Sequence, residues 1–318
     1  MKIVTPITIT NSQSASMPTP LQQIIQVPIL FRNGVRFWSP IDGYLYAWFE
    51  SIGSNGTATI WVSIPSSIPA NGTYQLYMIQ DSTLPMDGVY WGEAPQLSST
   101  YGQYDNGANV FNFYDNFAGT SLNTGKWSVT SGLTYSVNNG LSVTGSSQCG
   151  TGIESTATFS APIIVEGYAS FGSNTSTATG CYISGLGIWY TSGGQIAHGW
   201  APDSVQKYAL NGWTGSASFW SSADNPQPST NTYYVWGLGY ISASSAVGYV
   251  NYQQTSSTST SISTSGSLTV IINLQDNNVF PMSYYWYRVR AYPPNGVMPS
   301  VSFGSPQYSG ELVTVTVP

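Results

Sequence analysis

The chain has 318 residues, of which 6% are charged and 14% are aromatic, and its formal net charge is -6. An ordinary soluble domain has roughly 25% charged residues. The seven Lys and Arg form no basic stripe for a phosphate backbone, which argues against nucleic-acid binding. No apolar run reaches the roughly 20 residues of a membrane span. Ser, Thr, Asn and Gln must keep the protein in solution, and we expect an extracellular or cell-surface protein.

Alternating apolar and polar residues begin at the N-terminus and predict short strands at residues 3–10, 23–31, 44–49, 58–64 and 74–80. Gly, Pro and Asn turns separate these segments, and no helical period lies between them. Such a series of strands indicates an antiparallel β-sandwich.

The strand pattern fades between residues 81 and 109, which we interpret as the junction between two domains. About ten further strands are expected after it, a number that suits a two-sheet jelly roll. We therefore predict an all-β chain with two domains. An N-terminal antiparallel β-sandwich covers residues 1–108, and a jelly-roll β-sandwich with the closing C-terminal strands covers residues 109–318.

Three strand segments of the first domain carry a resemblance to a known family. They are residues 43–50 (GYLYAWFE), 58–65 (ATIWVSIP) and 72–78 (GTYQLYM). This stretch resembles the DUF2341 module of archaeal and bacterial surface proteins. The module has no assigned activity, so the resemblance implies a fold and a surface location.

A second resemblance lies in the other domain. Residues 113–127 (FYDNFAGTSLNTGKW) resemble the opening strand and loop of concanavalin-like, LamG-like jelly rolls. Residues 286–292 (WYRVRAY) and 299–304 (PSVSFG) resemble the final strands of the same arrangement. Together these segments resemble a DUF2341-containing surface protein of archaeal type with a concanavalin-like jelly roll.

Some glycoside hydrolases share this opening segment, and they place two Glu and one Asp on a single strand at i, i+2 and i+4. No such run occurs in this chain, whose five glutamates are isolated from one another. Each is expected to be a surface or turn residue. The resemblance therefore implies the fold without the catalytic carboxylates.

A polysaccharide-lyase arrangement is also missing. Lyases of similar fold use a Gln-x-His strand, whereas Gln195 and His198 are three positions apart and lie on opposite faces of a strand. His198 is the only histidine, so the chain can form neither a catalytic triad with a second histidine nor a metal site with two histidine ligands. We predict no catalytic residue and no enzymatic activity.

Aromatic residues gather between positions 189 and 240. Tyr and Trp give large contact areas with a polar tip, and flat rings stack on sugars or form protein interfaces. Trp200, Trp213 and Trp220 lie among Gly, Ser and Asn and are interpreted as loop residues. With Tyr208 they are the candidates for glycan or partner contact, and core packing is the alternative.

Arg288 and Arg290 lie on one face of the last predicted long strand, two positions apart. This spacing suggests that the two guanidinium groups have a paired role. A cation-π stack or an ion pair with a nearby carboxylate explains the pattern as well as ligand binding does. We favour the structural explanation.

Cys149 and Cys181 are the two cysteines, with no CxxC motif or Cys/His cluster beside them. In an exported β protein such a pair is expected to form one disulfide, and two buried thiols are the alternative. Asn-x-Ser/Thr sequons at Asn55, Asn71 and Asn174 are candidate glycosylation sites.

No organic cofactor is predicted. Asp115 and Asp276 begin Asp-Asn segments that supply hard oxygen ligands at loop positions, so a structural calcium ion fits there. Asx-turns explain the same residues without a metal.

The predicted function is a non-catalytic extracellular structural or adhesive protein, a filament or surface-layer subunit that assembles with itself or with other surface proteins. Strand-like termini at residues 3–10 and 312–317 favour it, because a terminal strand can complete a neighbour's sheet. The alternative is a lectin-like glycan-binding module that uses the tryptophans, and a polysaccharide-degrading enzyme is the third hypothesis.

Overall fold

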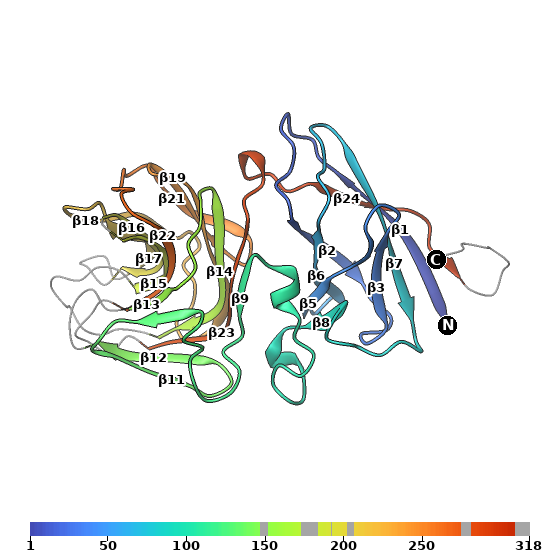
Figure 1. The fold of residues 1–318 in the computed structure, drawn as a ribbon, viewed down its shortest axis with the longest axis horizontal. Helices are drawn as coiled ribbons and strands as arrows, with labels where there is room; N and C mark the ends of the chain where they lie inside the picture. The colour runs from blue at the N-terminus through green and yellow to red at the C-terminus, as the bar shows by residue number, and fades with distance from the viewer. Residues whose placement is uncertain (147–151, 173–183, 192, 202–206, 275–280, 309–318) are drawn as a thin grey trace. The chain divides into compact units, whose positions relative to one another are not determined.

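A computed structural model of the chain describes all residues except 147–151, 173–183, 192, 202–206, 275–280 and 309–318. The chain divides into two compact units. Unit 1 comprises Met1–Phe113 and Pro293–Pro318, and unit 2 comprises Tyr114–Tyr292. Each unit is a pair of β-sheets (Figure 1). The described residues contain no helix long and apolar enough to cross a membrane.

Unit 1 contains a six-stranded and a four-stranded sheet. The larger sheet has the order β24-β1-β7-β3-β4, with β25 also paired to β1. Its strands are β1 (Lys2–Thr10), β3 (Val35–Ser39), β4 (Gly43–Leu45), β7 (Thr73–Asp81), β24 (Ser300–Phe303) and β25 (Gln307–Tyr308). The smaller sheet has the order β2-β6-β5-β8, with β2 (Leu21–Pro28), β5 (Ala47–Ile52), β6 (Thr57–Ile64) and β8 (Trp91–Glu93).

The core of unit 1 follows from residue alternation. Along β1 the side chains are alternately half-buried and buried, with Ile7 and Ile9 fully enclosed. They belong to an aliphatic and aromatic cluster that includes Ile60, Leu76 and Trp91. Because successive strand residues face opposite sides, this period-2 pattern is sufficient to direct one face of β1 inward.

The C-terminal strands differ from the predicted division. β24 pairs antiparallel with β1, with Ile7 opposite Phe303 and Ile9 opposite Val301. The chain therefore returns to unit 1 at Pro293, so β24 and β25 do not belong to the jelly-roll domain as predicted, whereas residues 286–292 do lie in unit 2. The first boundary lies after Phe113, whereas the prediction placed it after residue 108. A backbone pairing between segments this far apart leaves no local signal in the sequence.

The pairing of β1 also bears on assembly. β1 has β7 on one side and β24 and β25 on the other, so its backbone groups are used within its own chain. Assembly by donation of this N-terminal strand, which was one of the reasons for the filament prediction, is therefore excluded for β1. The other expected donor, residues 312–317, lies outside the described residues.

Unit 2 is the larger sandwich, with a seven-stranded and an eight-stranded sheet. The seven-stranded sheet has the order β10-β13-β22-β15-β16-β17-β18. Its strands are β10 (Trp127–Val129), β13 (Gly152–Ser155), β15 (Ser184–Tyr190), β16 (Gln195–Ala201), β17 (Lys207–Trp213), β18 (Ser218–Ala223) and β22 (Leu268–Leu274).

The eight-stranded sheet has the order β11-β12-β23-β14-β19-β20-β21, with β9 paired to β23. Its strands are β9 (Phe113–Asp115), β11 (Leu133–Val137), β12 (Leu141–Ser146), β14 (Ile163–Phe171), β19 (Tyr233–Ser242), β20 (Ser245–Val250), β21 (Gln253–Thr258) and β23 (Met282–Ala291). The helical segments within the described residues are short: η1 (Pro95–Leu97), α1 (Gly107–Val110) and η2 (Pro294–Gly296). The predicted all-β fold class, with a β-sandwich in each unit, is confirmed.

Two groups of ionisable side chains are buried inside unit 2. Glu166 on β14 accepts hydrogen bonds from Arg288 Nε at 2.7 Å and from Arg290 Nη2 at 2.8 Å. The Arg288 guanidinium also lies 4.4 Å from the centre of the Trp286 ring. The structural explanation of the arginine pair, an ion pair with a cation-π contact, is therefore confirmed. A second buried pair joins His198 Nε2 to Asp224 Oδ2 at 2.9 Å, and both side chains are fully enclosed.

These pairs predict how stability depends on pH. Burial raises the pKa of Glu166, but the Arg290 and Arg288 guanidiniums outweigh burial and hold that pKa below its ordinary value. A carboxyl whose pKa is depressed by folding stabilises the native state above its unfolded pKa of about 4.3, and this contribution is lost as the pH falls through the folded pKa. We expect the melting temperature to hold down to about pH 5 and to fall below about pH 4.

Calorimetric melting curves between pH 7 and pH 2 check this expectation, with Glu166→Gln as the reference because glutamine does not titrate. The melting temperature of Glu166→Gln at pH 7 should be lower than that of the wild type. It should also fall by less between pH 7 and pH 2. An equal acid-induced loss in both proteins would show that Glu166 does not carry the effect.

Candidate functional site

The outer face of the seven-stranded sheet carries the candidate site. Its opposite face is turned toward the other sheet: the His198 ring lies 5.3 Å from that of Trp236, and a Cβ at Gly167 would contact the Leu186 side chain. Residues next to these along each strand therefore face away from the core. Strand registers align these outward residues in rows that run across the sheet.

One row runs from β13 to β18. Its members, in order across the sheet, are Glu154, Ile271, Gly187, Ala197, Asn211 and Trp220. The strands approach closely in the middle of the row, because a Cβ at Gly187 would collide with the carbonyl oxygen of Ile196. A carboxylate thus lies toward one end of the row and an amide and an indole toward the other.

The neighbouring row is more aromatic. It consists of Thr269, Trp189, Gln195, Trp213 and Ser218. Because Trp213 and Trp220 are diagonal neighbours on paired strands, their Cβ atoms are roughly 7–8 Å apart. They are exposed to 39% and 47%, respectively. Two large rings are thus presented side by side on the same face.

The hairpin between β17 and β18 fixes this pair. Its turn is closed by the Thr214 N–H, which donates to the Ala217 carbonyl at 2.8 Å, and Gly215 adopts a φ of 109° there. The Thr214 hydroxyl also donates to the Ala217 carbonyl at 3.1 Å. The turn therefore sets Trp213 opposite Ser218 and determines which face both tryptophans occupy.

Most polar residues of the two rows are buried: Gln195 is 5%, Thr269 4% and Asn211 0% exposed. The Thr269 hydroxyl donates to Glu154 Oε1 at 2.7 Å. Asn211 is completely buried, and no group within the described parts of the chain donates to its Oδ1 atom. An unpaired buried acceptor costs about 1–3 kcal/mol. Because Asn211 is 0% exposed, this atom is not accessible to a ligand at the surface.

The predicted loop position is wrong for all three tryptophans, because Trp200 lies on β16, Trp213 on β17 and Trp220 on β18. Trp200 and Tyr208 are 9% and 1% exposed, so the alternative of core packing applies to these two contact candidates. Their rings are 5.0 Å apart, and Tyr208 lies 4.8 Å from Trp236 in the core. Gly, Ser and Asn around them were interpreted as turn residues, whereas in this sheet they occupy strand positions.

Gln195 and His198 lie on opposite faces, as predicted from their spacing. Gln195 belongs to the outer aromatic row, and His198 points into the core toward Asp224. The sequence analysis missed Glu154, Trp189 and Asn211 as members of the outer face. Alternation within each strand could have placed them on one side, but only the strand order brings them together.

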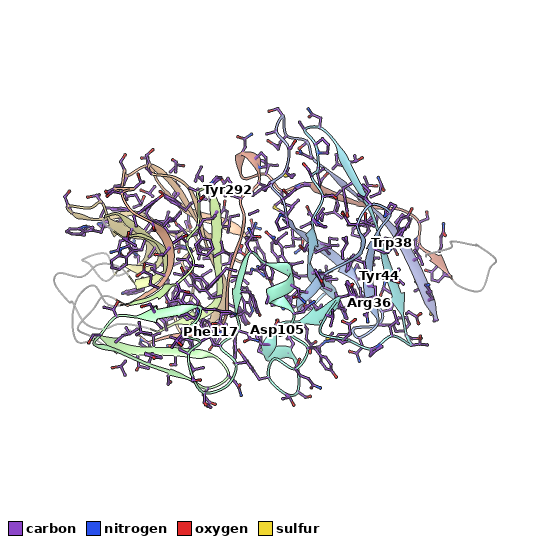
Figure 2. All side chains as sticks on the ribbon, viewed as in Figure 1. Arg36, Trp38, Tyr44, Asp105, Phe117 and Tyr292 are labelled. Atoms are coloured by element: carbon purple, nitrogen blue, oxygen red, sulfur yellow. The ribbon has the colours of Figure 1, made fainter. Side chains whose placement is uncertain are left out.

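The predicted ion ligand Asp115 is engaged by protein groups. Its Oδ2 accepts the Trp127 indole N–H at 2.6 Å, and its Oδ1 accepts the Phe117 N–H at 3.2 Å. Phe117, labelled in Figure 2, stacks on Trp127. Among the described residues no group of three His, Cys, Asp or Glu side chains could hold a metal. The other predicted ligand, Asp276, lies outside the described residues.

The remaining predicted sites stay predictions. Cys149, Cys181 and Asn174 all lie outside the described residues, so the disulfide and one sequon are not addressed. Asn55 and Asn71 are exposed in turns of unit 1.

Exposed tyrosines of unit 1 were not singled out from the sequence. Tyr44 and Tyr46, from the segment that resembles DUF2341, are 45% and 39% exposed. Both pack on Tyr90, with ring centres at 5.7 and 5.3 Å. The aromatic surface of the chain is therefore not confined to unit 2.

Comparison with known proteins found one curated relative that matches most of the chain. It is "Uncharacterized protein 562" of Sulfolobus islandicus rod-shaped virus 1, 31% identical over 350 residues that cover 92% of this chain. The chain spans 58% of that protein's length. No family model matches the sequence, so the likeness of unit 1 to DUF2341 remains a resemblance.

Solved structures with a similar fold are jelly rolls of glycan-degrading enzymes. One was solved in work on endo-acting O-glycanases of the human gut microbiota (TM-score 0.44, 14% identity, 57% of this chain and 99% of that chain). Another is β-agarase B from Zobellia galactanivorans, with a TM-score of 0.39 and 12% identity over 56% of this chain and 91% of that chain. A third is a family 16 glycosyl hydrolase from Mycobacterium smegmatis, with a TM-score of 0.37 and 13% identity over 56% of this chain and 99% of that chain.

These comparisons correct two predictions. A non-catalytic structural or adhesive protein, and the absence of enzymatic activity, were expected, whereas the solved structures of similar fold are glycoside hydrolases. The prediction rested on the lack of adjacent carboxylates in the sequence, which says nothing of carboxylates that different strands bring together. At such low identity the likeness concerns the fold alone and supplies neither a substrate nor a catalytic residue.

Proposed function

We propose that unit 2 binds a neutral glycan chain along the outer face of its seven-stranded sheet. The exposed pair of Trp213 and Trp220 carries this proposal, because the pair offers two flat rings on one rigid hairpin. The apolar face of a sugar ring stacks on such a ring, and two rings in a row suit successive sugars of a chain.

The polar neighbours suit a ligand rich in hydroxyl groups. Ser216 and Ser218 are exposed on the hairpin that carries the two rings, so hydroxyl groups that both donate and accept lie beside them. Glu154 is the one carboxylate of the two rows. This carboxylate would repel a negatively charged glycan, and the two rows contain no Lys or Arg to offset the repulsion. The face therefore favours a neutral chain.

An extracellular or cell-surface location and glycosylation at the exposed Asn55 and Asn71 belong to the same proposal. The likeness of unit 1 to DUF2341 surface modules of archaeal type supports that location.

Substitution of the two tryptophans tests the proposal. Trp213→Ala and Trp220→Ala are each expected to weaken glycan binding about 10- to 30-fold, as expected when a central aromatic anchor is removed. Binding is measured by calorimetry with the strongest ligand found on an array of neutral, amino and acidic oligosaccharides. Phe303→Ala, an exposed aromatic change in unit 1, is the matched control and should leave affinity unchanged.

Absence of any array ligand, or wild-type affinity in both tryptophan variants, would refute the proposal. The same incubations are assayed for new reducing ends. A lectin-like face leaves the length of the bound chain unchanged, whereas a glycan-cleaving site shortens it.

A further inference from the structure

A polar pocket lies on the other sheet of unit 2, separate from the tryptophan face. It has a volume of about 220 Å³ and opens between the β11–β12 hairpin and the neighbouring ends of β19 and β23. Its lining includes the side chains of Asn138, Ser142, Ser283, Tyr233 and Tyr285. None of the residues that line it is charged.

The hairpin that forms one wall is fixed in place. Its turn contains Asn139 at a φ of 52° and Gly140 at a φ of 133°. The N–H groups of these two residues donate to the carbonyl oxygens of Gly119, at 2.9 Å, and of Phe117, at 3.0 Å. The pocket is therefore a feature of ordered backbone and does not depend on a single side-chain rotamer.

The opposite wall is aromatic. Tyr233 lies 4.7 Å from Tyr285 and 5.3 Å from Tyr168, measured between ring centres, and Tyr168 lies 5.9 Å from Tyr285. Three rings in mutual contact restrict one another's motion. Burial raises the pKa of Tyr233, and the neighbouring Tyr285 raises it further, so its hydroxyl is protonated in neutral solution and can donate a hydrogen bond.

Size and chemistry together limit the ligand. At about 30 Å³ for each water molecule, 220 Å³ is equivalent to roughly seven waters, below the 300–1,000 Å³ of pockets for drug-sized ligands. This volume suits a single sugar ring. A charged ligand would lose hydration without gaining a partner charge, which is costly. Hydroxyl and amide groups both donate and accept, as sugar hydroxyls require.

We propose that this pocket binds one neutral sugar residue, which places its apolar face against Tyr233 or Tyr285 and its hydroxyls against the serine and asparagine side chains. This second site is independent of the glycan face on the seven-stranded sheet. The two sites share no residue, so either can exist without the other.

The test uses the full chain and the methyl glycosides of glucose, galactose, mannose and N-acetylglucosamine, followed by ligand-observed NMR titration. At least one glycoside should bind saturably with a Kd on the order of 1 mM, a common strength for a single small polar ligand. Ser142→Trp, which fills the pocket, should weaken that binding at least tenfold. If the tryptophan variant fails to fold, Ser142→Leu, which fills less of the pocket, is measured in its place.

Thr144→Trp is the matched control, because Thr144 is exposed two positions farther along β12 and does not line the pocket. It and the Trp213→Ala/Trp220→Ala double variant should keep wild-type affinity. The proposal is overturned if no glycoside binds saturably, or if the folded Ser142 variants bind like wild type. Loss of binding in the tryptophan double variant alone would also overturn it, because the sugar would then belong to the other face.

Discussion

Glu166→Gln is expected to lower the free energy of unfolding of unit 2 by about 3–5 kcal/mol, as removal of one partner from a buried ion pair does. Glu166 is 1% exposed and accepts hydrogen bonds from both Arg288 and Arg290, which are 0% and 7% exposed. Glutamine has almost the same volume but no charge. Two guanidiniums would then remain buried without the carboxylate that compensates them.

Urea unfolding followed by tryptophan fluorescence measures this change. Glu154→Gln is the matched control, since Glu154 is partly exposed and hydrogen-bonded to a single hydroxyl, and it should change stability by less than about 1 kcal/mol. Replacement of all three charged residues by Leu and Met of similar volume should recover much of the loss. Equal stability of Glu166→Gln and wild type would show that the cluster is solvated.

Trp236→Ala is expected to destabilise unit 2 by about 3–5 kcal/mol, the usual cost of removing a large aromatic side chain from a packed core. Trp236 is fully buried, and its ring lies 4.5 Å from Phe171 and 4.8 Å from Tyr208. Its indole N–H donates to the Ala169 carbonyl at 3.1 Å. The alanine variant would lose these contacts and leave a cavity between the two sheets.

Comparison with Trp220→Ala separates burial from residue type. Trp220 is 47% exposed on an edge strand, so its removal should change stability by no more than about 0.5 kcal/mol. The same urea titration measures both variants. If the two alanine variants lost similar stability, the placement of Trp236 at the centre of the sandwich would be incorrect.

The strand predictions succeeded because their signal is local. In β1 and β7 the apolar residues recur at every second position, and Gly, Pro and Asn mark the turns between strands. A period of two can bury one face of a strand only in an extended conformation. The same reasoning placed Arg288 and Arg290 on one face, and it placed Gln195 and His198 on opposite faces.

The burial of Trp200 and Tyr208 could not be predicted in this way. Their strands carry Gly199 and Gly212, which are typical of turns, and nothing local shows that these segments lie inside a seven-stranded sheet. The partner of the arginine pair was equally hidden, because Glu166 is 122 positions from Arg288 along the chain. Contacts of this kind depend on which strands become neighbours.

Composition and alternation were sufficient to predict that this chain is all-β and that it forms two sandwiches. Tertiary structure decided which aromatic residues are available, because strand order places Trp236 between the sheets and Trp213 and Trp220 on an outer face. It also returned the C-terminal strands to unit 1. Each strand's periodicity is a property of neighbouring residues, whereas the order of strands depends on packing between segments far apart in the chain.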